Sequence, residues 1–233
     1  MVEFVQFTTD RLVMIYGVYS MICLMFLVFA YKLSKRGEST PQKTHIVRFF
    51  VFTALGLILN MAYAPFDNVP IQMLGNKTVI LLTTMSLCNL MLFTLIVNKS
   101  SMVITDQKRF LIQAVVLGLC VVYYVIPITF GEGFQPDWRP IMWIYMITVT
   151  ETLILSMYFG IRTAINIEAK EIRRRFLNFL IGVLFIAVML VYTALRNGRI
   201  ITSPIFLLLG LAIIPGGLLI YYGVGRELDE KQK

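Results

Sequence analysis

The sequence predicts an all-α, polytopic membrane protein with seven transmembrane helices in one bundle. Three observations support this fold class. First, 58% of the 233 residues are hydrophobic and only 15% are charged, whereas a soluble domain has about 45–50% apolar and roughly 25% charged residues. Second, the apolar residues gather in seven long blocks. Third, Lys and Arg are enriched in every second connection between these blocks.

Each block is long enough to cross a membrane, because about 20 mostly apolar residues span roughly 30 Å of hydrocarbon. The connections between the blocks are short, so residues 1–233 are expected to form a single transmembrane domain. The first block follows the acidic leader MVEFVQFTTD and exceeds a typical signal core in length, so we expect it to be retained. The predicted helices are 12–31, 46–64, 78–97, 110–128, 141–160, 176–195 and 203–222.

The distribution of basic residues predicts the orientation. Segments 32–48, 98–109, 161–176 and 223–233 together hold 16 of the 21 Lys and Arg residues. By the positive-inside rule these segments face the cytoplasm, which places the N-terminus outside and the C-terminus inside a cell membrane. The net charge of +8 then faces the anionic headgroups of the lipid bilayer. We therefore expect no binding of nucleic acid.

The outer loops carry one candidate modification site. Asn76, Lys77 and Thr78 form an N-glycosylation sequon on the predicted outer side, which makes Asn76 a candidate glycosylation site. The second outer loop, TFGEGFQPDWRPIMW, mixes Gly and Pro with aromatic residues. We interpret it as an interfacial aromatic belt; the alternative is a lid over an outward-facing pocket.

The third inner loop, RTAINIEAKEIRRRF, contains no Gly or Pro and is expected to be a helical extension that runs into the sixth crossing. Glu171 and Arg175 have the favourable i, i+4 spacing for an ion pair. Arg173, Arg174 and Arg175 anchor the topology, or they form a docking site for a protein partner on the cytoplasmic side.

The last crossing contains Pro215, Gly216 and Gly217. Pro215 lacks an amide donor and predicts a kink near the middle of the membrane. The two glycines allow close helix approach. These three residues are candidates for a hinge, and static packing is the alternative.

Glu151 is the one charged side chain near the middle of any of the seven apolar blocks. A charge at that depth costs about 2.5–3.5 kcal/mol, so we expect Glu151 to face the bundle interior. Asn89 is predicted at nearly the same depth and is the first candidate partner; Asn60 and Gln113 are more distant ones. Thr148 and Tyr158 give the helix of Glu151 some polar character. Three roles remain open: an interhelical hydrogen bond, a proton or cation site, and a ligand contact in a sensor.

No cofactor or metal site is expected. Cys23, Cys88 and Cys120 all lie within apolar blocks, where they act as small packing residues. A single histidine, His45, excludes a bis-histidine haem. Enzyme motifs such as His-Glu-x-x-His and Gly-x-Ser-x-Gly are absent from the sequence, so we expect a protein that is not an enzyme.

The segments YFGIRTAINIEAKEIRRRFLNFLIGVLFI and PIFLLLGLAIIPGGLLIYYGVGR resemble the later helices of the seven-helix input domains found on prokaryotic histidine kinases. Only RELDEKQK follows Gly225, so the resemblance implies an input module without its own output domain. We therefore expect a non-enzymatic sensor or receptor-like module that acts in signal transduction through a separate partner or as a homo-oligomer. The alternatives are a small proton- or cation-coupled transporter and a structural subunit of a membrane complex.

Overall fold

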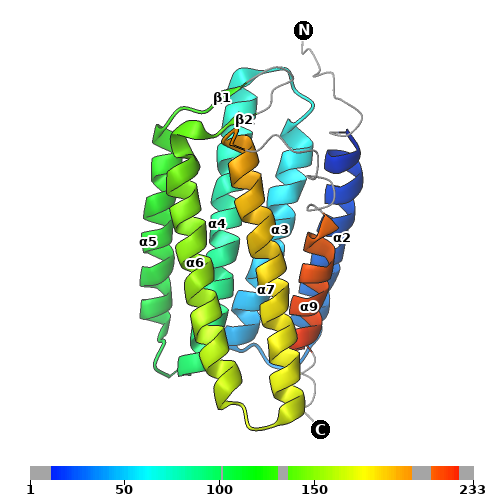
Figure 1. The fold of residues 1–233 in the computed structure, drawn as a ribbon, viewed down its shortest axis with the longest axis vertical. Helices are drawn as coiled ribbons and strands as arrows, with labels where there is room; N and C mark the ends of the chain where they lie inside the picture. Colours follow the sequence, from blue (N-terminus) through cyan, green and yellow to red (C-terminus); the bar gives the residue numbers. More distant parts are fainter. Residues whose placement is uncertain (1–11, 101, 131–135, 201–210, 226–233) are drawn as a thin grey trace.

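The protein folds into an elongated bundle of nearly antiparallel helices in a computed structural model that describes residues 12–100, 102–130, 136–200 and 211–225 (Figure 1). The helices are η1 (Val13–Val18, a π-helical turn that runs into the next helix), α2 (Tyr19–Lys35), α3 (Pro41–Tyr63), α4 (Val69–Lys99), α5 (Asp106–Val125), α6 (Arg139–Asn166), α7 (Lys170–Asn197) and α9 (Ile213–Gly225). The strands β1 (Thr129–Phe130) and β2 (Pro136–Asp137) pair antiparallel in the connection before α6.

Six helical segments in the described part of the chain are long and apolar enough to cross a membrane, so the chain is a membrane-embedded, all-helical protein. They are Val13–Lys35, Pro41–Tyr63, Val69–Lys99, Asp106–Val125, Arg139–Asn166 and Lys170–Asn197. The seventh predicted block, 203–222, is described only from residue 211 onward, where α9 forms a shorter apolar helix. Residues 203–210 of that block lie outside the described residues.

Several helices extend beyond the apolar blocks because local capping favours earlier starts. Thr40 precedes Pro41, and its hydroxyl accepts a hydrogen bond from the Lys43 amide. Asn68 caps α4 in the same way through the Ile71 amide, so α4 begins nine residues before the predicted block at 78. A polar N-cap that satisfies a free amide, followed by proline in the first turn, is a favourable helix start.

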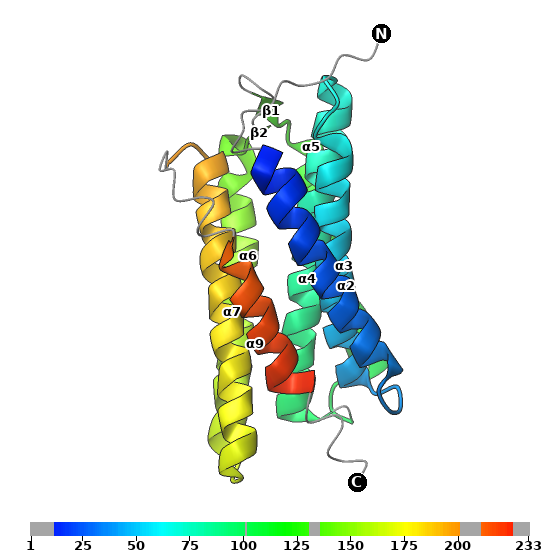
Figure 2. The same cartoon turned by 90° about the vertical axis from the view of Figure 1, so that its right-hand side faces the viewer.

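The long helices pack around one shared core. Helix α3 packs between α2 and α4, and α4 also contacts α6. Helix α7 packs on α6, and α9 fills the space between α7 and α2 (Figure 2). Helix α5 lies at one edge against α4 (Figure 1). The loops 36–40 and 167–169 and the residues 100 and 102–105 gather at one end of the bundle, here called the basic end (Figure 1).

Glycines permit the close approach of α9 to its neighbours. A Cβ atom at Gly182 would lie 2.6 Å from the Gly216 carbonyl oxygen, and a Cβ at Gly217 would lie 2.3 Å from the Phe26 ring. The expectation that Gly216 and Gly217 allow close helix packing is therefore confirmed. Pro215 is exposed and stands in the first turn of the described helix, where a missing amide donor costs little. The kink was predicted relative to the first part of this block, of which residues 203–210 lie outside the described residues.

Candidate functional site

Glu151 lies on the outer surface of the bundle, so the prediction that it faces the interior is wrong. It is exposed on α6, in a stripe with Ile147, Ile154 and Tyr158, whose exposed fractions are 56%, 60% and 49%. Among the described residues, Glu151 has no hydrogen-bond or ion-pair partner. The physical reason is rotation about the helix axis. The next residue, Thr152, is buried, and successive residues are separated by about 100° around an α-helix.

The four residues proposed for a ligand or proton site are not brought together. Tyr158 shares the outward stripe with Glu151, and its ring lies under the Arg162 guanidinium at 5.6 Å. Thr148 is buried, and its hydroxyl donates to the Ile144 carbonyl. Asn89 is completely buried on α4. The expected Asn89–Glu151 hydrogen bond is therefore wrong, and we retain Glu151 only as an outward-facing candidate.

Asn89 instead belongs to a buried polar network near the basic end. Its Oδ1 atom lies 2.8 Å from Nδ1 of His45, and Gln113 Nε2 donates to the same oxygen at 3.4 Å. The Asn89 amide nitrogen donates to the Met85 carbonyl at 2.8 Å. This bond orients the amide so that its oxygen faces His45. An amide oxygen only accepts, so His45 Nδ1 carries the proton.

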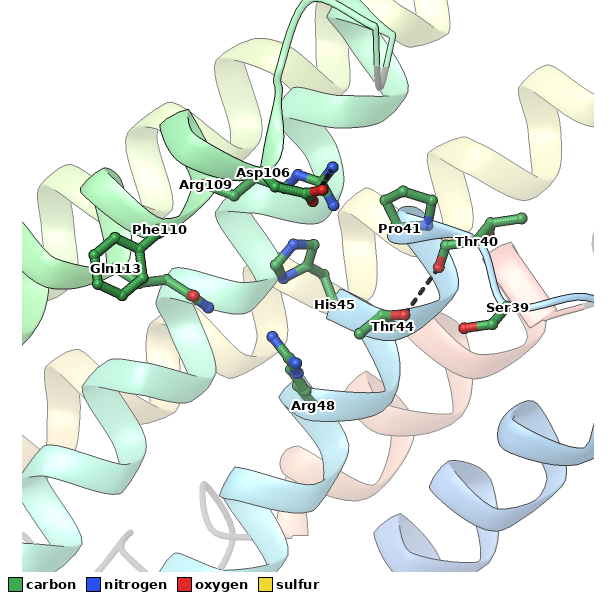
Figure 3. A pocket seen from close by; sticks show the side chains of 10 residues that line it. All are labelled: Ser39, Thr40, Pro41, Thr44, His45, Arg48, Asp106, Arg109, Phe110 and Gln113. Atoms are coloured by element: carbon green, nitrogen blue, oxygen red, sulfur yellow. Dashed lines mark hydrogen bonds and ion pairs between the residues drawn. The ribbon is translucent and has the colours of Figure 1, made fainter.

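A pocket of about 320 Å³ opens beside this network, between the first turns of α3 and α5. Figure 3 shows Arg48 and Arg109 on either side of the His45 ring, with Gln113 nearby. The pocket is lined by Ser39, Thr40, Pro41, Thr44, His45, Arg48, Asp106, Arg109, Phe110 and Gln113. From the sequence, Gln113 was a distant candidate partner of Glu151 and His45 only the single histidine. The pocket was missed because the sequence does not show that the starts of α3 and α5 line one cavity. The sequence signal that could have indicated a polar site is the spacing of Thr44, His45 and Arg48, which places them on adjacent turns near the capped start of one helix.

The two arginines of the pocket differ in their partners. Arg109 forms an ion pair with Asp106 at 2.6 Å, and its Nε donates to the Ile104 carbonyl. Arg48 is exposed and has no ion pair or hydrogen bond to any described residue. Buried Lys43, one turn before it, donates to the loop carbonyls of Gly37 and Glu38 rather than to a carboxylate. The pocket is therefore electropositive.

The third loop at the basic end is not one continuous helical extension. Helix α6 runs to Asn166, the chain turns at 167–169, and α7 begins at Lys170. The Arg173 guanidinium donates to the Ile167 carbonyl and closes the turn. Arg175 pairs with Glu171, as its spacing predicted. Of the three proposed docking arginines, Arg174 alone is exposed without a partner in the described part of the chain.

The opposite end of the bundle rules out the interpretation of Asn76 as a glycosylation site. Asn76 is buried inside α4, where its Oδ1 accepts from Trp138 Nε1 at 2.8 Å and its Nδ2 donates to the Tyr63 hydroxyl. An oligosaccharide on this nitrogen would have no space. Trp138 is likewise buried rather than interfacial, whereas Trp143 is 65% exposed, as an aromatic belt requires. The alternative of a lid in this loop involves residues 131–135, which lie outside the described residues.

An acidic side chain organises the turn before α6. Asp137 is buried. Its carboxylate accepts hydrogen bonds from Nε and Nη2 of Arg139 at 2.9 and 2.5 Å, and it forms an ion pair with Nε of Arg199 at 3.4 Å. The hydrogen bonds from Arg139 hold the pKa of Asp137 below its ordinary value. This cluster fixes the connection between β2 and α6 to the end of α7.

Comparison with known proteins gives no relative from which function could be transferred: no family model, curated sequence or solved structure matches the chain. The resemblance to input domains of histidine kinases stays a prediction. The outward stripe of α6 and the pocket at the basic end are the features that indicate a function.

Proposed function

We propose that this protein is a non-enzymatic sensor or receptor-like module of the cell membrane that acts through a separate transmembrane partner. The observation that carries the proposal is the position of Glu151, which is exposed on the outer side of α6 without a partner among the described residues. It is the thirteenth of 28 residues in α6, and therefore lies close to the middle of a helix about 42 Å long.

The exposed acid is costly unless something covers it. A carboxylate at the centre of the bilayer costs about 2.5–3.5 kcal/mol on insertion scales. It cannot reach the polar headgroups by extending along the helix, because it is about 18 Å from the start of α6. Its neighbours on the stripe, Ile147 and Ile154, supply no hydrogen bond. A second transmembrane helix on this stripe would remove the carboxylate from lipid.

Charge complementarity identifies the partner helix. A Lys or Arg near the middle of a transmembrane helix carries a comparable insertion cost, and pairing it with Glu151 relieves both charges. The apolar side chains around Glu151 provide the packing surface for such a helix. We therefore assign to this stripe a partner helix with one basic residue near its centre, and not a second copy of this chain, whose own stripe would present another acid.

Support for seven crossings comes from the placement of α9. Helix α9 packs on both α7 and α2 and closes the bundle (Figure 2). The loops at the basic end contain Lys35, Arg36 and Lys99 at their borders. By the positive-inside rule we propose that this end faces the cytoplasm and that the N-terminus is outside. Exposed Arg174 at the same end is a second candidate contact for a cytoplasmic protein.

The carrier alternative is less well supported by this geometry. It depended on Glu151 as an interior acid on a substrate path, and Glu151 is exposed on the outside of the bundle. The role of a structural subunit uses the same stripe and differs only in whether the complex transmits a signal.

Site-specific photo-crosslinking tests the proposal. A photoreactive residue at Ile147, on the stripe, is compared with one at Val121 of α5, because the two positions are 56% and 57% exposed. In native membranes we expect the Ile147 probe alone to form an adduct with a transmembrane segment that carries a central Lys or Arg, identified by mass spectrometry. Glu151→Leu should remove this adduct. Adducts with lipid only, or with a second copy of the chain, would refute the proposal.

A further inference from the structure

The pocket at the basic end carries an inference that is independent of the partner helix. We propose that it is a binding site for a phosphate-bearing anion, supplied either by the headgroup of an anionic lipid or by free phosphate in solution. Its volume of about 320 Å³ lies at the lower end of the range for small-molecule sites, about 300–1,000 Å³.

Arg48 supplies the charge that would hold the anion. The charge of Arg109 is already balanced by Asp106. Arg48 has no counter-ion or hydrogen bond among the described residues, and its guanidinium points toward His45 and the pocket (Figure 3). A guanidinium presents a planar set of donors that matches two phosphate oxygens. Arg48 is therefore the primary anion contact, because its guanidinium has no partner among the described residues and points toward the pocket.

The start of α3 adds donors on the same wall as Arg48. Ser39 and Thr40 line the pocket, and their hydroxyl hydrogens are not used in hydrogen bonds with described residues. The Thr44 hydroxyl, by contrast, donates to the Thr40 carbonyl. The dipole of α3 also favours an anion near its first turn. Arg48 and the start of α3 therefore line the same cavity from one helix.

The buried network fixes the floor of this cavity. Asn89 holds the protonated Nδ1 of His45, so Nε2 is the ring nitrogen left for the pocket. Gln113, which also lines the pocket, is held by the same asparagine oxygen. The floor is thus ordered before any ligand binds, and Phe110, which is 72% exposed at the rim, offers an apolar surface to an acyl chain.

Ligand retention by the full-length chain tests the proposal. The protein is placed in nanodiscs of phosphatidylcholine with or without phosphatidic acid, and bound lipid is counted by native mass spectrometry. A parallel thermal-unfolding series adds inorganic phosphate to phosphatidylcholine nanodiscs. Arg48→Gln is the test variant, and Arg174→Gln is the matched control because Arg174 is also exposed and unpaired in the described structure. Arg48→Lys keeps the charge but loses the planar donor set.

We expect Arg48→Gln to weaken binding of the phosphate group about tenfold or more (about 1.4 kcal/mol), Arg48→Lys to weaken it less, and Arg174→Gln to leave it unchanged. Arg48-dependent retention of phosphatidic acid would identify a lipid, and an Arg48-dependent thermal shift with phosphate alone would identify a soluble anion. Equal losses for Arg48→Gln and Arg174→Gln would reduce the effect to general surface charge and overturn the proposal. Absence of binding by both probes would overturn it as well. Since Arg48 is exposed, the unfolding temperature without ligand should match that of the parent protein.

Discussion

The packing of α9 on α7 predicts a strong effect for a single methyl group at Gly182. A Cβ atom there would lie 2.6 Å from the Gly216 carbonyl oxygen and 2.9 Å from the Ile220 amide nitrogen. Both are backbone atoms, so one of the helices must move. Gly118 of α5 is the matched control, because a Cβ at that position meets no atom within 4 Å.

The difference between Gly182→Ala and Gly118→Ala isolates the steric cost. Both substitutions gain the same helix propensity, up to about 1 kcal/mol, which therefore cancels. Overpacking of a tight contact costs about 1–3 kcal/mol. For a chain of this size, each kcal/mol corresponds to roughly 2–4 °C in Tm. When both variants are heated in the same detergent, we expect the Tm of Gly182→Ala to lie roughly 2–12 °C below that of Gly118→Ala, which corresponds to about 1–3 kcal/mol. Equal unfolding temperatures would show that α9 does not pack on α7 as described.

Three further outcomes concern the end of the bundle opposite the basic end. Trp138→Phe removes the donor to Asn76 and should cost about 1–3 kcal/mol of stability in thermal unfolding, whereas Trp143→Phe should change it by less than about 0.5 kcal/mol; equal effects would contradict the Trp138–Asn76 hydrogen bond. The pKa of Asp137 is lowered in the folded state, so the ionised carboxylate stabilises the fold. This contribution to the free energy of unfolding is fully present at pH 7 and is lost as the pH falls below 3.8, the ordinary pKa of an aspartate. Asp137→Asn should lower Tm at pH 7 and flatten its decline in acid; parallel Tm curves for the parent and the variant would refute this assignment. Expression in a glycosylating host should give a chain whose gel mobility a glycosidase does not change, and a shift that Asn76→Gln abolishes would show that Asn76 is accessible.

The sequence predicted the helices well because their main signal is local. Blocks of about 20 apolar residues need no knowledge of neighbouring segments, and six of the seven blocks coincide with long apolar helices. Their ends were less accurate, since capping by Asn68 and the turn at 167–169 depend on local hydrogen bonds that composition does not encode. The close packing of Gly216 and Gly217 was also predictable from residue size alone.

The candidate site was mostly beyond prediction because it depends on helix rotation and on which helices are neighbours. Depth along the membrane suggested that Asn89 and Glu151 meet, but α6 turns Thr148 and Thr152 inward and Glu151 outward. Asn89 is engaged by His45 from α3, a helix whose orientation relative to α4 the sequence does not specify. Depth and polarity gave candidates, and only the packing decided which of them meet.

A charge-exchange experiment tests most directly whether the stripe around Glu151 binds a basic transmembrane helix. The partner identified by crosslinking is co-reconstituted with this chain in nanodiscs, and the fraction in complex is measured by native mass spectrometry. We expect Glu151→Lys to abolish the complex and the reciprocal Lys-to-Glu or Arg-to-Glu change in the partner to restore it, whereas Thr148→Val, on the buried face of the same helix, leaves it intact. A complex that forms equally well with Glu151→Lys and the unchanged partner would contradict the account.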